Sequence, residues 1–201
     1  MALVPLVPLV PLVLPGAQVA LDPAWLSIVE ADALFATLVA TVPWEMHRIR
    51  LFGRQVDAPR LSCWIGDPDA VYTYSGTRLQ PRPWPDALRS LRTRLRRELG
   101  VDFNSVLANF YRDGRDRMGW HSDDERALGA RPVIASLSLG ASRRFVLKQR
   151  KDALVKRALA LPHGSLLLMT GDTQARYKHA LPATAKPVGE RINLTFRRII
   201  V

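Results

Sequence analysis

The chain has 201 residues, of which 48% are hydrophobic and 23% are charged, and its formal net charge is +11. This balance is typical of one compact globular domain and excludes a disordered or fibrous protein. The basic excess favours a polyanionic partner such as nucleic acid or an anionic membrane surface. The single cysteine, Cys63, excludes an intramolecular disulfide and a cysteine-based zinc site, so we expect a protein of the reducing cytoplasm.

The first fifteen residues are apolar but carry several prolines, each of which removes a backbone donor and breaks a helix. They also lack the basic segment that opens an export signal. We therefore predict that residues 1–16 form a Pro-rich, low-complexity and mobile tail before a domain over 17–201; the alternative is a start codon assigned upstream of the real domain. No other stretch reaches the roughly 20 apolar residues of a spanning helix, so we expect no membrane partner.

Two helices are predicted in the N-terminal half. Ser27 and Glu30 match a capping box ahead of an apolar run that Pro43 closes, which indicates a helix over 28–41. Residues 86–99 place their leucines on one helical stripe, and Gly100 ends the helix. Arginines cover the other faces of this second helix, and they have two interpretations: a solvated surface, or contacts to phosphate.

The remaining pattern is mainly β. Short strand-like runs over 46–52, 64–65 and 71–75 are separated by glycine and proline, and Gly53 after Phe52 indicates a tight tip. After Gly100, strands are expected over 105–111, 133–139, 144–148, 165–169 and 191–200. This order predicts one α+β domain, mainly β, in which a sandwich or barrel has both helices on one side.

The strongest candidate functional residues begin at His121. In an extended segment, residues at i and i+2 point to the same side, so His121 and Asp123 can offer an imidazole and a carboxylate to one point. Such a pair is common by chance and needs a third ligand. His179, well downstream, would complete a two-histidine, one-carboxylate set, which holds one face of a non-haem Fe(II) and leaves the opposite face open.

The segment from 191 to 197 alternates polar and apolar side chains. On a strand, Arg191, Asn193, Thr195 and Arg197 share one face and the apolar residues share the other. Two arginines directed inward need anionic partners, so a bound dicarboxylate would compensate both charges. The planar guanidinium suits this task because it grips a carboxylate through two hydrogen bonds. The alternative is an edge strand whose arginines reach solvent.

Together these motifs resemble the AlkB family of Fe(II)- and 2-oxoglutarate-dependent nucleic-acid dealkylating dioxygenases, over about residues 20–200. The family's N-x-Y, D-G and H-x-D-D-E elements are similar to Asn109-Phe-Tyr111, Asp113-Gly114 and His121–Glu125. Segments 51–54 and 72–76 are most similar to the branch that repairs duplex DNA. The resemblance implies a double-stranded β-helix, or jelly roll, with two supporting helices in its N-terminal half.

The resemblance also implies residue roles. Iron would be bound by His121, Asp123 and His179. The carboxylates of 2-oxoglutarate would pair with Arg191 and Arg197, in an order that stays open, assisted by Asn109, Tyr111, Asn193 and Thr195.

For the substrate, the resemblance implies that Phe52 enters the base stack beside a flipped nucleotide, flanked by Gly53 and Arg54. Tyr72, Tyr74 and Ser75 would line the lesion pocket, and Asp124 would lie near the flipped base. An aromatic face and a carboxylate suit the cationic bases 1-methyladenine and 3-methylcytosine. Taken without the resemblance, Phe52 is more often a core residue, and the Tyr-x-Tyr pair is more often one face of a core strand.

The implied activity is repair of alkylated DNA by oxidative demethylation, which consumes 2-oxoglutarate and O2 at Fe(II) and releases formaldehyde, succinate and CO2. Duplex DNA is the expected partner, with single-stranded DNA or RNA left open, and we expect a monomer. One alternative keeps the dioxygenase and changes the substrate to RNA, protein or a small molecule. Another is a nucleic-acid-binding protein with a vestigial site.

Overall fold

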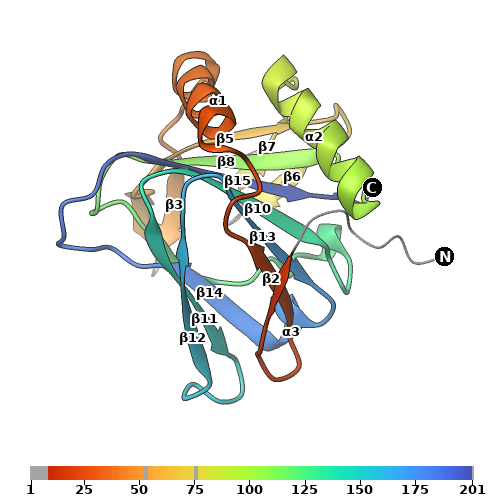
Figure 1. Ribbon diagram of the computed structural model, residues 1–201, viewed down its shortest axis with the longest axis vertical. Coiled ribbons are helices and arrows are strands. Elements are labelled where there is room, and N and C mark those ends of the chain that lie inside the picture. Colours follow the sequence, from red (N-terminus) through yellow and green to blue (C-terminus); the bar gives the residue numbers. More distant parts are fainter. Residues whose placement is uncertain (1–8, 52–53, 75–76, 201) are drawn as a thin grey trace.

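The computed structural model describes residues 9–51, 54–74 and 77–200 (Figure 1). Its main element is a seven-stranded antiparallel sheet in the order β1 (Val10–Leu12), β2 (Gln18–Asp22), β13 (Ser165–Thr170), β10 (Ile134–Gly140), β15 (Arg191–Arg197), β8 (Ser105–Tyr111) and β5 (Leu61–Gly66). A second, four-stranded sheet has the order β12 (Lys156–Leu161), β11 (Arg143–Gln149), β14 (Tyr177–Leu181) and β9 (Met118–His121). The two sheets share an apolar core that includes Ile134, Leu147 and Leu167, and together they form the expected jelly roll.

Two hairpins stand beside the sheets. One pairs β3 (Arg48–Leu51) with β4 (Arg54–Asp57), and the other pairs β6 (Tyr72–Tyr74) with β7 (Thr77–Leu79). The first hairpin agrees with the turn that Gly53 predicts, since Leu51 is in register with Arg54. The roles predicted for Phe52, Gly53 and Ser75, and for the side chains of Arg54, Tyr72 and Tyr74, lie outside the described residues and side chains.

Both predicted helices are confirmed with their bounds, as α1 (Ile28–Thr41) and α2 (Asp86–Leu99). The Ser27 hydroxyl accepts a hydrogen bond from the Glu30 backbone, and the Glu30 carboxylate accepts one from the Ser27 backbone, so the capping box forms as expected. Gly100 ends α2 in the left-handed conformation at φ 68°. A short helix, α3 (Thr173–Arg176), and a 3-10 turn (Arg126–Leu128) complete the helical elements of the described chain.

The helices cover the outer face of the seven-stranded sheet (Figure 1). Leu88 and Leu95 of α2 belong to one buried cluster with Leu194 and Phe196 of β15. The apolar face of β15 therefore meets the helices, while Arg191, Asn193, Thr195 and Arg197 face the space between the two sheets. This confirms the alternation that the sequence predicts for this strand and excludes the solvent-facing alternative.

Arginines on α2 form ion pairs with neighbouring acidic residues. Arg92 forms two hydrogen bonds with Asp67, at 2.6 and 2.9 Å. Arg94 binds Glu98 at 2.9 Å and lies over the Trp25 ring, 4.2 Å from its centroid. These two side chains hold α2 against the rest of the domain and do not present a free phosphate-binding face.

The N-terminal segment differs from the expectation of a mobile tail, because Val10–Leu12 forms strand β1 on the edge of the large sheet. Pro11 is tolerated there since an edge strand has one side on which no ladder hydrogen bond is needed. Leu14 is buried, and the Tyr177 hydroxyl donates to the Pro15 carbonyl at 2.9 Å. None of the helices of the described chain has the length and hydropathy needed to cross a bilayer.

Candidate metal centre and cosubstrate pocket

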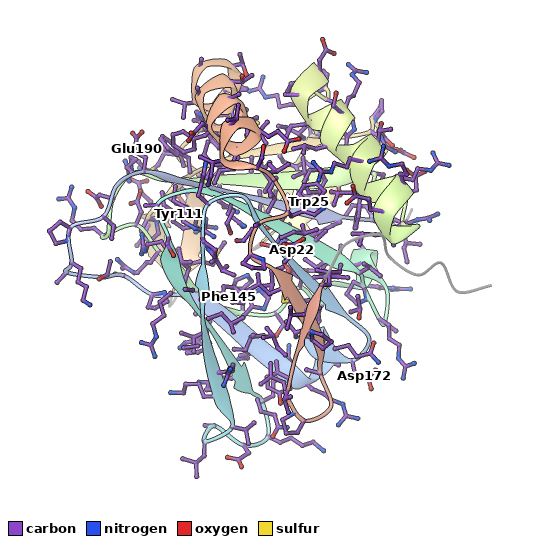
Figure 2. All side chains as sticks on the ribbon, in the orientation of Figure 1. Asp22, Trp25, Tyr111, Phe145, Asp172 and Glu190 are labelled. Carbon is purple, nitrogen blue, oxygen red and sulfur yellow. The ribbon has the colours of Figure 1, made fainter. Side chains whose placement is uncertain are left out.

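A cavity lies between the two sheets. Tyr111 on β8 and Phe145 on β11, which Figure 2 labels, line it from one sheet each. All nine predicted metal and cosubstrate residues line it, on strands β8, β9, β14 and β15 or just after β9; they are Asn109, Tyr111, His121, Asp123, His179, Arg191, Asn193, Thr195 and Arg197. The structure therefore brings together residues that are far apart in the sequence.

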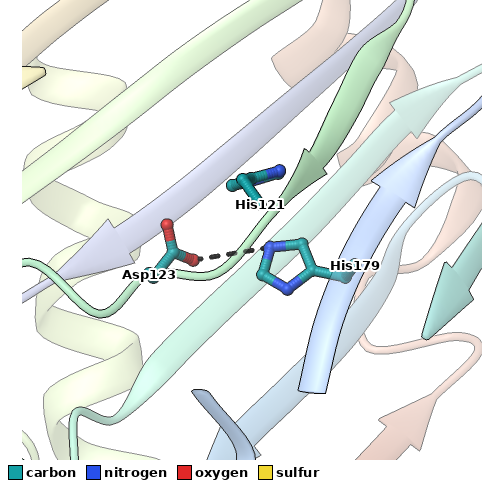
Figure 3. A group of neighbouring side chains, drawn as sticks. All are labelled: His121, Asp123 and His179. Atoms are coloured by element: carbon teal, nitrogen blue, oxygen red, sulfur yellow. Dashed lines mark ion pairs between the residues drawn. The ribbon is translucent and has the colours of Figure 1, made fainter. Parts of the chain in front are cut away.

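Three of these side chains form a compact cluster (Figure 3). His121 and His179 lie opposite one another on β9 and β14, with their ring centroids 4.2 Å apart. Asp123 follows the end of β9, and its Oδ2 lies 3.7 Å from Nε2 of His179. One ligand atom from each residue falls within 4.8 Å of the others. Two imidazoles and one carboxylate at this spacing match the ligand set of a non-haem iron site.

A β-bulge in β9 directs His121 into the cavity. His121 pairs with His179 and Met118 with Leu181, so β9 advances three residues while β14 advances two. The extra residue lies at Gly119 and Trp120, where regular alternation would otherwise place Met118 and His121 on opposite faces. Both side chains consequently line the cavity, and Trp120 is directed to the surface with 43% of its area exposed.

Hydrogen bonds orient His121 and the segment up to Asp123. Nδ1 of His121 lies 2.8 Å from the Gly119 carbonyl, and because a carbonyl only accepts, Nδ1 carries the proton and Nε2 is the bare nitrogen. The backbone N–H of Asp123 donates to the buried Gln174 side chain at 2.9 Å. Ser122 donates to the Tyr177 carbonyl at 2.8 Å. These bonds tie the segment after β9 to α3 and β14.

The charge states within the cluster suit a metal ligand set. Burial by itself raises the pKa of Asp123, but the Arg197 guanidinium together with His179 and His121 outweighs burial and holds this pKa at about 2. Burial lowers the pKa of His179 to about 3, against the opposing effect of Asp123. At neutral pH the carboxylate is therefore ionised and the His179 imidazole is neutral, which are the forms that bind a cation.

The two arginines of β15 differ in their partners. Arg197 donates to Oδ1 of Asp123 at 2.6 Å, inside the protein. Arg191 is only 1% exposed, donates to Ser138 at 2.8 Å and lies over the Tyr111 ring at 5.3 Å. No carboxylate of the described residues lies within 4 Å of Arg191, and burial lowers its pKa to about 10. Arg191 is thus a buried cation that lacks an anion.

The polar residues around these arginines are held by further hydrogen bonds. Arg60, itself buried, donates to Asn109 at 2.8 Å. Asn193 donates to Ser136 at 2.8 Å, and Thr195 donates to Asn193 at 2.9 Å. The motifs did not identify Arg60, Ser136 or Ser138. The alternating serines of β10 are a weak signal that could have been used, whereas nothing local distinguishes Arg60.

The cavity fits a divalent cation and a dicarboxylate. Oδ2 of Asp123 is buried and has no hydrogen-bond partner among the described residues, although it faces His179. Nε of Arg191 is likewise buried without an acceptor in the described chain. A buried acceptor beside two imidazoles and a buried cation without an acid are both costly unless a ligand compensates them.

Asp124 does not line this cavity. Its side chain is 47% exposed and accepts a hydrogen bond from Arg150, which also donates to Ser122 at 2.8 Å. The structure thus places Asp124 at the surface beside the cluster, in an ion pair that the sequence did not predict.

The fold and the site agree with comparisons to known proteins. The model of the 2OG-Fe(II) oxygenase superfamily matches residues 18–197, and the chain belongs to this superfamily, within its AlkB-related part. It is 39% identical over 192 residues to the alpha-ketoglutarate-dependent dioxygenase alkB homolog 3 of rat (Rattus norvegicus), covering 91% of this chain and 64% of that protein. It is 39% identical over 184 residues to the human (Homo sapiens) DNA oxidative demethylase ALKBH2, covering 86% of this chain and 70% of that protein.

The chain therefore spans just under two thirds of the length of the rat relative. Among solved structures, that of OsALKBH1 matches with a TM-score of 0.61 and 18% identity, over 95% of this chain and all of that chain. This likeness concerns the fold and agrees with the jelly roll described above.

Proposed function

We propose that this protein repairs DNA by oxidative demethylation of N-alkylated bases such as 1-methyladenine and 3-methylcytosine. The observation that carries the proposal is the cluster of His121, Asp123 and His179 in a cavity that also buries Arg191, which has no acidic partner among the described residues. The similarity to proteins called DNA oxidative demethylases supports DNA as the substrate. The net charge of +11 supports it further, since DNA is a polyanion.

In this proposal His121, Asp123 and His179 hold Fe(II). When bound, iron and 2-oxoglutarate supply the oxidising chemistry: O2 converts the cosubstrate to succinate and CO2 and adds one oxygen atom to the methyl group, after which formaldehyde leaves the base. The chain supplies position and charge. Arg197 keeps Asp123 ionised and oriented, and the bond between His121 and Gly119 keeps Nε2 directed at the metal.

Arg191 binds one carboxylate of 2-oxoglutarate in this proposal, at the end of the cavity remote from the cluster. Its fork has a free Nε, and a carboxylate there would compensate its buried charge. Tyr111 lies against the guanidinium and limits its movement. Asn109, Asn193 and Thr195 provide the polar wall of the cavity, and Arg197 is close enough to the cluster to meet the carboxylate next to the metal.

DNA contacts are proposed on the residues that the family resemblance implies. Phe52 enters the base stack, with Gly53 and Arg54 beside it. Tyr72, Tyr74 and Ser75 line the lesion pocket, and Asp124 lies near the flipped base. An apolar wedge offsets part of the unstacking cost, which is a few kcal/mol, and is useful only on a stacked duplex. We therefore propose duplex DNA as the preferred substrate.

The domain organisation and the cellular context are proposals of the same kind. Residues 17–201 would constitute the catalytic domain, preceded by the Pro-rich segment 1–16, whose last part contributes β1. The protein would act as a monomer, since one chain supplies every residue of the cavity. A single buried thiol suits the reducing cytoplasm.

The test is incubation of the protein with Fe(II), 2-oxoglutarate, O2 and oligonucleotides that carry 1-methyladenine or 3-methylcytosine, followed by mass measurement of the bases and of succinate. Loss of one methylene mass per lesion, with an equal amount of succinate, is the expected result. Succinate without repair of either base, on duplex or single strands, would contradict the DNA substrate and leave a dioxygenase of RNA, protein or a small molecule. No succinate under any condition would contradict the enzyme itself.

A further inference from the structure

The outer face of the four-stranded sheet carries a row of three lysines. Lys148 on β11 is directly opposite Lys156 on β12 and Lys178 on β14 in the two antiparallel ladders. Residues directly opposite one another project to the same face, with Cβ atoms about 4.5–5.5 Å apart. Their neighbours Leu147 and His179 are buried on the inner face, so the row points away from the cavity.

This row is unfavourable for the isolated protein. Like charges directly opposite one another destabilise a sheet, and here three stand side by side. Within the described ranges, no ion pair to a carboxylate compensates any of the three lysines. Arg144, also on β11, is exposed on the same face, because Phe145 and Leu147 point inward. The face therefore concentrates positive charge where folding alone would favour a mixed surface.

An exposed aromatic side chain borders the row. Trp120 lies at the bulge of β9, the edge strand of this sheet, and Nζ of Lys148 is 4.4 Å from the centroid of its ring. A lysine over a tryptophan face is held by a cation–π interaction. Basic side chains with an exposed aromatic ring are the combination that binds single nucleic-acid strands, because phosphates meet the cations and a base stacks on the ring.

We propose that this lysine face, consisting of Lys148, Lys156, Lys178 and Trp120, binds the phosphate backbone of the DNA strand next to the target base. This inference rests on the proposed function and names a second contact surface for its substrate. Neighbouring β-strands are about 4.8 Å apart, so the row spans roughly 10 Å. One DNA strand carries a charge every 3.4 Å or so along its axis, so the row matches about three phosphates.

The position of the lysine face relative to the metal cluster supports this assignment. Trp120 directly precedes His121, and Lys178 directly precedes His179. The same two strands therefore carry cluster residues on the inner face and lysine-face residues on the outer face. A strand that delivers one base to the cavity would pass the edge at β9 and continue over the lysine face.

The experiment measures how binding of an undamaged single-stranded oligonucleotide depends on salt, by fluorescence anisotropy. The variant K148Q/K156Q/K178Q removes three charges from the lysine face. The matched control R89Q/R96Q/R97Q removes three charges from α2, which lies beyond the large sheet (Figure 1). We expect the lysine variant to reduce the slope of log K against log salt by about 2, and the control by less than 1. Trp120→Leu should weaken binding about 5- to 150-fold at constant salt.

Equal slope changes in the two triple variants would overturn the inference, because they would report net charge alone. The lysine variant should melt no lower than the wild type, since it relieves repulsion; if it melts lower, the single variant K156Q on β12 is used, with an expected slope change of about 0.7. Demethylation by the wild type separates the two proposals. Repair with equal slopes rejects the lysine face alone, whereas different slopes without repair reject the proposed activity and keep the lysine face as a nucleic-acid site.

Discussion

Arg197 and Asp123 form a buried ion pair, with Nη2 of the guanidinium 2.6 Å from Oδ1 of the carboxylate. The pair leaves Oδ2 of Asp123 facing His179 and keeps the carboxylate ionised in spite of its burial. Arg197 therefore directly supports Asp123, one of the three proposed metal ligands. Arg191 forms no ion pair with an acid of the described residues, so in the proposed function it is the buried cation that meets a bound anion.

Replacing Arg197 by leucine should destabilise the protein by about 3–5 kcal/mol, because it leaves the Asp123 carboxylate buried without its partner. Urea unfolding in the absence of metal measures this change. Arg144→Leu, an exposed position on β11, is the control and should stay within about 0.5 kcal/mol of the wild type. A loss for Arg197→Leu no larger than that of the control would show that the pair contributes nothing.

Arg191→Met should affect the free energy of unfolding in the opposite way from Arg197→Leu. Removing a buried cation that has no acidic partner should leave the unfolding free energy of the ligand-free protein unchanged or higher. The affinity for 2-oxoglutarate should fall about 10- to 150-fold for each charge-assisted hydrogen bond lost. Calorimetric titration with 2-oxoglutarate in the presence of Mn(II) measures the affinity. Unaltered binding would mean that another group holds the cosubstrate.

His121→Ala should abolish turnover without unfolding the protein, because this imidazole is only half-buried and its hydrogen bond is to the carbonyl of Gly119 within the same strand. Addition of Mn(II) at 100 times the dissociation constant should stabilise the wild type by about 2.7 kcal/mol and the variant by almost nothing. The melting temperature with and without Mn(II) reports the difference. His47→Ala, outside the cavity, is the control, and stabilisation of both variants by Mn(II) would argue against this ligand set.

Phe52→Ala should lower repair of duplex DNA much more than repair of single strands, since a wedge replaces stacking only in a duplex. The ratio of the two rates for the same 3-methylcytosine sequence measures the effect. Leu51→Ala, the preceding apolar position of the hairpin, is the matched control. Losses of the same size on both substrates would reject the wedge role for Phe52.

Cys63 should make stability fall at high pH. Burial raises the pKa of its thiol from 9.0 to about 11, so the folded protein favours the protonated form. The resulting stabilisation is present below pH 9 and is lost as the pH rises toward 11, by about 2–3 kcal/mol. Unfolding of the wild type and of Cys63→Ala at pH 8 and pH 10.5 measures it. The same loss in both proteins would assign the effect to other groups.

Local patterns in the sequence determined much of this protein. The capping box of Ser27 and Glu30 is satisfied within one turn, so α1 begins where the sequence indicates. The two faces of β15 follow from the period of a strand, which is the same whatever lies next to it. The pairing of Arg191 and Arg197 on one face could be predicted for the same reason. The substrate contacts, by comparison, came from family resemblance alone.

Other features were decided only in the tertiary structure. The strands β12 and β14 escaped prediction because their outward faces are charged, and β1 because its proline suits only an edge. The bulge that turns His121 inward exists because β9 and β14 advance by different numbers of residues, which no single strand encodes. Arg60, which directly precedes β5, donates to Asn109 on the neighbouring strand β8, a contact between segments far apart in the sequence. Residue periodicity is a short-range property, whereas the register between distant strands depends on how the whole core packs, and that packing sets which side chains meet in the cavity.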